Sequence, residues 1–384
     1  MLTKSLKFEN FEKKNKSSQI RNYLKNILKK NNEVVKSLHP DYILSYPKKI
    51  ISKAKKFEEV QLIGMGGSIL GAKTIYNFLS HKIKKKFSFV DNIKTGNFKI
   101  SSKKKLNLVI SKSGNTLETI TNANILIKKK DKNLFITENK KSYLTNLATK
   151  LKADVVHHND FIGGRYSVLS EVGMLPAELM GLRINKFKKL NNLIKNKSFL
   201  NSLVLNVANT LNLIKKKKFN SIILNYDEKA SDLFFWYQQL IAESLGKKNK
   251  GILPVVSLMP RDNHSLMQLY LDGFKNNFFT FFFVKDSSKN KINNLNLLES
   301  HFFLKGKNLN NILEAQYLAT KKIFRKNKIP FRSFYINKRD EEALGELFTF
   351  FILETILLGM ALKVNPYNQP AVELIKKETS KILR

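Results

Sequence analysis

The chain has 384 residues, 42% of them apolar and 11% aromatic, and a formal net charge of +39. This composition provides enough apolar material for a large core and excludes disordered and fibrous proteins. Cysteine is absent, which excludes disulfides, zinc–thiolate sites and cysteine nucleophiles. At about 100–200 residues per domain, the length predicts two to three domains.

The first 45 residues are polar and rich in lysine. Their apolar side chains recur at helical spacing between residues 20 and 28, so we expect an N-terminal helical segment over residues 1–45. The start of the chain has no apolar run typical of a signal peptide. We therefore expect a cytoplasmic protein.

Residues 46–184 alternate between short β-rich runs and helical stretches. The predicted strands are 60–63, 87–90, 106–111, 134–137 and 155–156. Strands separated by helical patterns are typical of βαβ units. This part of the chain is predicted to be one α/β domain, a parallel sheet with helices on both faces.

Residues 185–384 repeat this alternation after a predicted connecting helix at 184–200. The predicted strands are 221–225, 279–284 and 331–336, and the predicted helices are 232–245, 309–326, 341–362 and, at the C-terminus, 371–383. The longest apolar stretch, 348–362, contains Glu354 and is shorter than the roughly 18 residues of a membrane span. We expect a second α/β domain closed by a C-terminal helix, and no membrane association.

The net charge raises the alternative of a nucleic-acid-binding protein. Of the 69 basic residues only eight are arginine, the residue that proteins prefer for reading bases. Lysine is accompanied by abundant Asn, Ile and Phe, which share A/T-rich codons. We favour a compositional bias and expect no nucleic-acid partner.

Two glycine- or hydroxyl-rich loops follow predicted strands and begin helices. The first, GMGGSILG at 64–71, lacks the third glycine of the dinucleotide-binding fingerprint and the lysine position of the NTPase phosphate loop. It is either a ligand-facing turn or a structural one. The second, SKSGNTLET at 111–119, offers three hydroxyls and backbone N–H groups at a helix start, which favours binding of a phosphate monoester. An ordinary capping box explains part of this second pattern.

Three charged residues are candidates for catalysis. Arg165 follows a Gly pair in an arginine-poor chain, and its guanidinium suits an oxyanion as well as a surface salt bridge. Glu243 lies near a helix C-terminus, where a carboxylate is electrostatically disfavoured, so its presence there needs a reason. His264 begins another helix and alone is as consistent with a structural role. The other histidines have no metal-ligand spacing, so we expect no metal.

Together these segments resemble the glucose-6-phosphate isomerase family. The residues that carry the resemblance are GMGGSILG (64–71), SKSGNTLET (111–119), GGRYSVLSEVGMLPAEL (163–179), ESLGK (243–247), NHSLMQLYLDG (263–273) and NQPAVELIKK (368–377). The resemblance implies two sugar isomerase (SIS) domains, with an active site at their junction and at a dimer interface. It implies a homodimer that requires no cofactor.

The resemblance also implies a role for each matching residue. The phosphate-binding residues are Ser111, Lys112, Ser113 and Thr116. The sugar-binding residues are Gly66, Gly67, Ser68 and Gln369. The catalytic residues are Glu243 as the base, Arg165 as the stabiliser of the enediolate, and His264 with Lys376 for opening the sugar ring.

The implied reaction is the reversible conversion of glucose-6-phosphate to fructose-6-phosphate, a step of glycolysis and gluconeogenesis. An aldose–ketose isomerase needs a base, a cation for the enediolate oxygen, an acid for ring opening and a phosphate site. Two alternatives remain open: another SIS-domain isomerase, acting on mannose-6-phosphate, or a non-catalytic regulator that binds a sugar phosphate. Glutamine-dependent amination is excluded because it needs a cysteine nucleophile.

Overall fold

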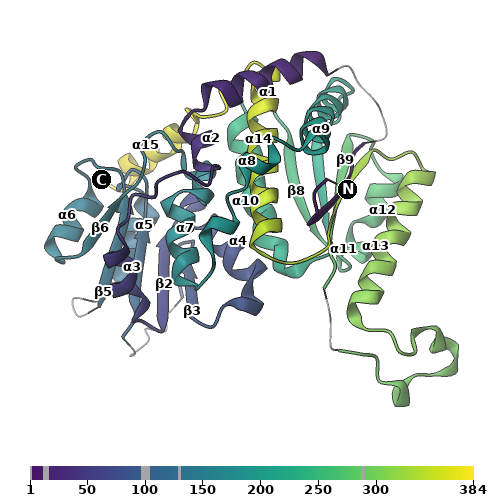
Figure 1. Cartoon of the computed structure of the whole chain (residues 1–384), viewed down its shortest axis with the longest axis horizontal. Helices are drawn as coiled ribbons and strands as arrows, with labels where there is room; N and C mark the ends of the chain where they lie inside the picture. The colour runs from purple at the N-terminus through teal and green to yellow at the C-terminus, as the bar shows by residue number, and fades with distance from the viewer. Residues whose placement is uncertain (1, 12–16, 97–103, 129–130, 287–289) are drawn as a thin grey trace.

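The protein consists of two five-stranded sheets that lie side by side, each with helices against its faces (Figure 1). The structure is a computed structural model that describes residues 2–11, 17–96, 104–128, 131–286 and 290–384. The first sheet has the order β3-β2-β4-β5-β6 and every neighbouring pair is parallel. Its strands are β2 (Glu59–Gly64), β3 (Lys86–Val90), β4 (Leu106–Ile110), β5 (Lys132–Thr137) and β6 (Asp154–His157).

All five strands expected in the first half of the chain are present. The helices that accompany them are α3 (Lys48–Lys55), α4 (Leu70–Phe78), α5 (Leu117–Leu126), α6 (Tyr143–Lys150) and α7 (Glu171–Leu179). The near-continuous apolar sequences of β4 and β5 are explained by their position, because strands inside a parallel sheet are covered on both faces.

The second sheet has the order β1-β10-β9-β7-β8 and is parallel except for β1. Its strands are β1 (Leu6–Glu9), β7 (Asn220–Asn225), β8 (Leu253–Leu258), β9 (Asn277–Val284) and β10 (Phe331–Ile336). The sequence interpretation missed β1 and β8, the two edge strands. β1 has only four residues, two of them charged, and β8 contains Pro254, so neither has a clear strand pattern.

The N-terminal segment is therefore only partly helical. It contains α1 (Ser18–Lys30) and α2 (Glu33–Ser37), but its first described residues form β1 and belong to the second sheet through the pairing of Leu6 with Ile336. The domain limits at residues 45 and 184 remain predictions.

The second half contains the remaining α-helices. They are α8 (Leu190–Leu193), α9 (Lys197–Lys215), α10 (Ser231–Leu245), α11 (Asp262–Ser265), α12 (Met267–Asp272), α13 (Leu309–Lys326), α14 (Glu341–Ala361) and α15 (Val372–Ile382). The predicted connecting helix at 184–200 is wrong. Asn196 accepts a hydrogen bond from the backbone N–H of Phe199 and so caps a new helix, α9, within that stretch.

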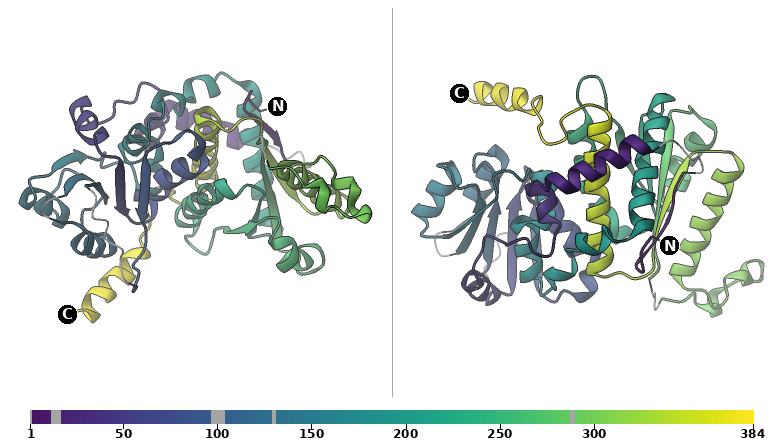
Figure 2. Two further views of the ribbon diagram at one scale, coloured as in Figure 1. Left: turned by 90° about the horizontal axis from the view of Figure 1, so that it is seen from below. Right: turned by 45° about the horizontal axis from the view of Figure 1, so that its top comes forward.

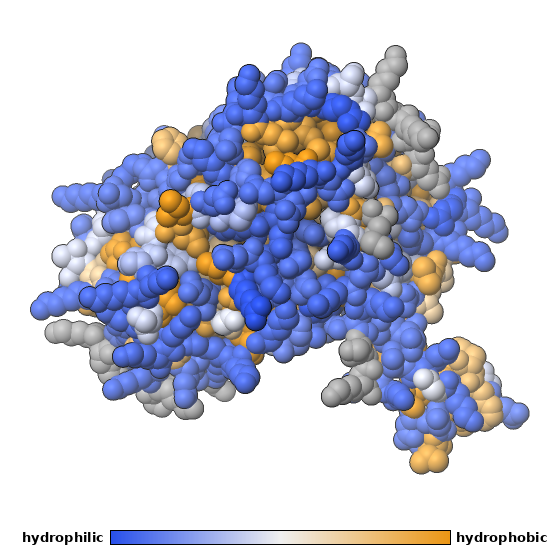
Figure 3. Space-filling model, viewed as in Figure 1, coloured by the Kyte–Doolittle hydropathy of each residue, from blue (hydrophilic) through white to orange (hydrophobic). Residues whose placement is uncertain are grey.

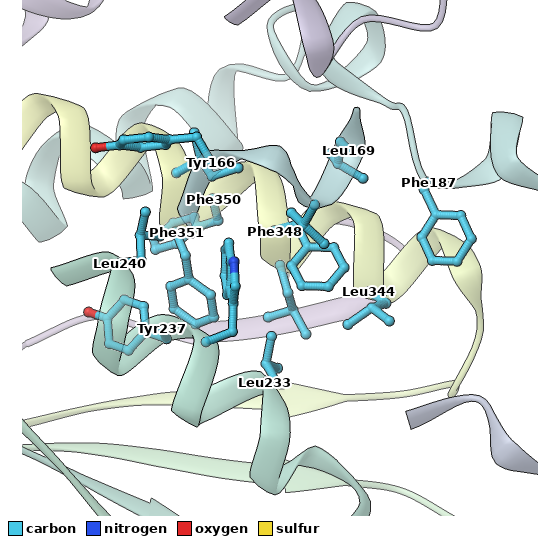
Figure 4. Close-up of a cluster of buried hydrophobic side chains, with 14 of the residues drawn as sticks. Tyr166, Leu169, Phe187, Leu233, Tyr237, Leu240, Leu344, Phe348, Phe350 and Phe351 are labelled. Atoms are coloured by element: carbon cyan, nitrogen blue, oxygen red, sulfur yellow. The ribbon is translucent and has the colours of Figure 1, made fainter. Parts of the chain in front are cut away.

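The core helix α14 lies between the two halves (Figure 1). It is long and apolar enough to cross a membrane, but 89% of its most apolar 18-residue window is buried inside the protein. Aromatic side chains of α14 and α10 meet there, for example Phe351 with Tyr237 at 4.5 Å between ring centroids (Figure 4). Burial on every side explains why this helix has no polar face.

Two segments extend from this body. Helix α15 has no buried residue and projects from one end (Figure 2), and the short 3₁₀ helices Asn294–Asn296 and Glu299–Leu304 protrude at the other. Most of the molecular surface seen in Figure 3 is hydrophilic.

Candidate active site

The two motif loops lie next to each other because β2 and β4 are neighbouring parallel strands. Gly64 of β2 pairs with Ile110 of β4, so residues 66–68 and 111–116 both follow the carboxyl ends of strands. Ligands of open parallel sheets bind at this edge. A Cβ atom on Gly67 would lie 2.2 Å from the carbonyl carbon of Gly164, so the close approach of the first loop to the segment that carries Arg165 requires glycine.

The second loop presents hydroxyl groups at the start of α5. The Oγ of Ser111 and the Oγ1 of Thr116 lie 2.9 Å apart, and Ser113 is exposed. The Nζ of Lys112 donates to the carbonyl of Asp160 at 2.7 Å and lies 3.3 Å from Glu138. Its ammonium group is thus engaged beside the loop.

Arg165 is held rigidly in the 3₁₀ helix Gly164–Leu169, with only 2% of its surface exposed. Its Nη1 donates to the Oε1 of Glu243 at 3.1 Å and to the Oε1 of Gln369 at 2.9 Å. Its Nε donates to the Oγ of Ser244 at 2.7 Å. The planar guanidinium therefore joins three segments that are far apart in the sequence.

Glu243 lies near the end of α10, and 23% of its side chain is exposed. Its Oε1 accepts from Arg165, and its Oε2 accepts from the Nε2 of Gln239 at 3.0 Å. Gln239 in turn packs against Gly66, where a Cβ atom would lie 2.8 Å from that Nε2. The carboxylate is thus oriented from two sides and still reaches solvent.

The sequence interpretation missed the residues that support this pair. Gln239 lies four residues before Glu243 and therefore on the same face of α10, which is the one available signal. Ser244 accepts from Arg165 and lies 2.9 Å from the hydroxyl of Tyr166, a contact that no local pattern indicates.

Lys247 connects the end of α10 to the segment that carries Gln369. Its Nζ donates to the carbonyls of Ser244 and Asn365, at 2.6 and 2.7 Å. Burial and then the charge of Arg165 lower the pKa of Lys247 to about 8, although Glu243 opposes this. The ammonium group fixes the two segments that present Glu243 and Gln369.

A cavity of about 900 Å³ opens beside these residues, lined among others by Glu243, Lys247 and Gln369. Lys376 lines a separate cavity of about 550 Å³ together with Ser113 and Thr116, and its Nζ bonds Glu373 at 2.7 Å. Lys376 therefore faces the hydroxyl-rich loop and not the carboxylate of Glu243.

His264 is exposed in α11, beyond β8, and lines neither cavity. The structure of the single chain thus brings together Arg165, Glu243 and Gln369, with Gly66 and Gly67 packed behind them, but not His264. Ser68 lies in the 3₁₀ helix Gly66–Ser68. Among the described residues no group of three or more His, Asp or Glu side chains is arranged to hold a metal ion.

The arrangement suits proton abstraction next to a carbonyl. A carboxylate that reaches solvent can accept a proton, and a buried guanidinium beside it can stabilise a developing oxyanion. The hydroxyl-rich helix start at the same sheet edge can bind the phosphate of the substrate.

Comparison with known proteins agrees with this geometry. A glucose-6-phosphate isomerase of Methanocaldococcus jannaschii is 33% identical over 339 residues, covering 84% of this chain and 83% of that protein. A crystal structure of a hypothetical protein from Thermus thermophilus has a TM-score of 0.82 at 23% identity, covering 95% and 94% of the two chains.

A crystal structure of a glucose-6-phosphate isomerase from Chlamydia trachomatis has a TM-score of 0.68 at 19% identity, covering 87% of this chain and 71% of that one. The predicted α/β fold with two SIS domains is confirmed. The family described as phosphoglucose isomerase matches residues 48–384. The chain belongs to the phosphoglucose isomerase family.

Proposed function

We propose that the protein interconverts glucose-6-phosphate and fructose-6-phosphate through a cis-enediolate. The observation that carries this proposal is the contact between the buried Arg165 and the partly exposed Glu243, at 3.1 Å. Membership of the phosphoglucose isomerase family supports the same reaction.

In this reaction Glu243 is the base. Its carboxylate removes the proton from C2 of the open-chain aldose and returns it to C1, while the hydroxyl proton on O2 passes to O1, which gives the ketose. The negative charge that develops on the enediolate oxygen lies next to Arg165, whose rigid guanidinium needs no reorganisation to stabilise it. Gln239 and Arg165 each hold one carboxylate oxygen, so the base is oriented before the substrate binds.

The phosphate is bound by the hydroxyls of Ser111, Ser113 and Thr116 at the start of α5. Lys376 lines the smaller cavity together with Ser113 and Thr116. Its ammonium group therefore approaches the sugar from the side of the phosphate. Ring opening is assigned to Lys376 and His264. Because His264 is remote from the base in its own chain, we propose a cytoplasmic homodimer in which each subunit supplies this histidine to its partner.

A coupled assay tests the proposal. The wild type is expected to convert fructose-6-phosphate to glucose-6-phosphate, which a glucose-6-phosphate dehydrogenase reports as NADPH absorbance. Glu243→Gln keeps the shape of the side chain and should lower kcat by about 10²–10⁴-fold or more. The exposed Glu58→Gln is the matched control and should be fully active.

Two outcomes would contradict the proposal. More than a tenth of wild-type turnover in Glu243→Gln would show that another group is the base. A wild type that turns over mannose-6-phosphate but neither of the two proposed substrates would assign it to the other SIS-domain reaction, and binding without any turnover would make it a regulator.

A further inference from the structure

A buried pair of polar side chains flanks the segment that carries Arg165. His158 follows β6, and Glu171 is the first residue of α7. The Nδ1 of His158 and the Oε1 of Glu171 are 2.5 Å apart, and each side chain is only 1% exposed. The proposed reaction uses neither residue.

This pair binds both ends of the loop at 159–162. The Oε1 of Glu171 also accepts the backbone N–H of Asn159 at 3.0 Å, where the loop begins. The Nε2 of His158 lies 2.9 Å from the carbonyl oxygen of Ile162, where the loop ends. Gly163, Gly164 and Arg165 follow immediately in the chain.

The hydrogen bonds define where the protons lie. A carbonyl oxygen only accepts, so the Nε2 of His158 carries a hydrogen. Burial raises the pKa of Glu171, but the hydrogen bond and charge of His158 and the backbone N–H of Asn159 together hold it below its ordinary value. The Oε1 of Glu171 is thus in hydrogen-bond contact with both the Nδ1 of His158 and the backbone N–H of Asn159.

Other groups around the pair belong to the N-terminal segment and the interdomain connection. The hydroxyl of Tyr42 donates to the Oε2 of Glu171 at 3.4 Å, and the Nζ of Lys188 lies 4.5 Å from the ring centroid of Tyr42. Asn159 donates from its side chain to Glu33 at 2.8 Å. Tyr42 thus holds the second carboxylate oxygen of Glu171, and Glu33 holds the side chain of Asn159.

The loop leads directly into a segment that is tightly packed at the site. The backbone of Gly164 is packed so closely on Gly67 that a single added Cβ atom would lie 2.2 Å from it. Arg165 is buried and bonded to Glu243, Ser244 and Gln369. A displacement of the loop at 159–162 therefore moves the guanidinium relative to the base.

We propose that His158 and Glu171 are a positioning pair that sets the geometry of Arg165 relative to Glu243. The inference rests on the proposed isomerase function. Because Arg165 stabilises charge that develops only in the transition state, loss of the pair should lower kcat and leave KM almost unchanged. A misplacement of about 1 Å can lower a rate by about 10²-fold.

The experiment compares four variants in the coupled assay, with kcat expressed per folded protein. His158→Ala and Glu171→Ala should each lower kcat by about 10–100-fold, with KM for fructose-6-phosphate within about threefold of wild type. The double variant should resemble either single one, because the two residues act as one unit. Glu171→Gln can still bond a neutral His158 and should retain most of the activity.

A second measurement separates positioning from mere stability. A phosphorylated five-carbon hydroxamate resembles the planar enediolate, and its inhibition should weaken in parallel with the loss of kcat/KM. Val204→Ala, in buried α9, is the control for destabilisation; it should lower the melting temperature without changing kcat per folded protein. If His158→Ala does not fold, Glu171→Asp replaces it, because it keeps the charge and withdraws the carboxylate by one methylene.

The inference is overturned if His158→Ala, or Glu171→Asp in its place, has wild-type kcat per folded protein, or if Val204→Ala loses as much. It is also overturned if KM rises as much as kcat falls. A wild type without isomerase activity would overturn the proposed function and this inference together, whereas an active wild type with unaffected variants would overturn the inference alone.

Discussion

Three of the eight arginines of this chain are buried at positions where a rigid fork of donors is needed. Arg165 bonds residues of two other segments, α10 and the stretch that carries Gln369, and Arg332 and Arg339 are likewise buried beside carboxylates. Lysine supplies nearly all the remaining positive charge, mostly at the surface. A lysine has one point of charge and would leave several acceptors around Arg165 without a donor.

Replacement of Thr116 by Val tests the phosphate loop. Val keeps the shape but removes the hydroxyl that lies 2.9 Å from the Oγ of Ser111. If this loop binds the phosphate equally in the ground and transition states, KM should rise about 10-fold while kcat changes little. Steady-state kinetics and the inhibition constant of inorganic phosphate measure this, with the exposed Thr149→Val on α6 as control. A pure kcat defect would place the phosphate elsewhere.

Glu346 gives a prediction about stability and pH. Burial raises the pKa of Glu346 to about 7, although Thr3 donates a hydrogen bond to it. The unfolded carboxyl has a pKa near 4.3, so folding takes up a proton between these values and stability falls as the pH rises from about 4 to 7.

Glu346→Gln accepts the same hydrogen bond without a charge. At pH 8 it should be more stable than wild type by about 1–3 kcal/mol, and the difference should disappear near pH 4. Urea unfolding at several pH values measures this. An equal gain at every pH would attribute the effect to something other than titration.

At the level of elements, the sequence predicted those whose pattern is complete within the element. Strand β4 and helices α10 and α14 are rich in apolar residues over the right length, and β2 and β5 each contain a short apolar run. Edge strand β1 exists because β10 offers it a partner some 330 residues away, and nothing in four residues of its own sequence signals this. Pairing with a strand that is distant in the sequence therefore decides that β1 forms.

Glu354 is a charged residue within the apolar part of α14, and its partner in the neighbouring sheet explains its presence. Arg332 of β10 forms a buried salt bridge with Glu354 of α14, and donates also to Asn206 at 2.9 Å and Tyr237 at 3.0 Å. Removal of one member of such a pair leaves a buried charge without a partner. The pair therefore fixes the register of the core helix against the second sheet.

Arg332→Met should destabilise the protein by about 3–5 kcal/mol, because Glu354 then loses its buried counterion. The double variant Arg332→Met with Glu354→Leu should recover much of this loss. Chemical unfolding of the two variants measures both values. If the double variant were as unstable as the single one, packing and not charge would be the cause.

At the scale of the whole molecule, the resemblance to a family predicted more of the site than periodicity did. Arg165, Glu243 and Gln369 are in contact although they lie far apart in the sequence, and no local pattern predicts this contact. The motifs that contain these three residues are part of the family resemblance, and the structure of the single chain brings the three side chains together. His264 is the exception, since it is exposed and apart from the site in one chain.

A shared-site dimer accounts for that exception and can be tested by complementation. If each site combines Glu243 of one subunit with the partner's histidine at position 264, the variants Glu243→Gln and His264→Ala are each inactive or severely impaired as homodimers. In a mixed dimer, one site contains both changes and the other contains neither. Equal amounts reassort so that about half the dimers are mixed, which restores roughly a quarter of the wild-type sites.

The measurement is isomerase activity after the two inactive variants are refolded together. Differently tagged subunits, recovered as one complex, prove that exchange has occurred. Each variant refolded alone is the control and should stay inactive, since its two sites carry the same single change. Activity near roughly a quarter of wild type requires that the histidine and the carboxylate of one site come from different chains, because sites built within one chain would each keep their own lesion. Proven exchange without recovered activity would therefore place His264 in the site of its own subunit and exclude the shared-site dimer.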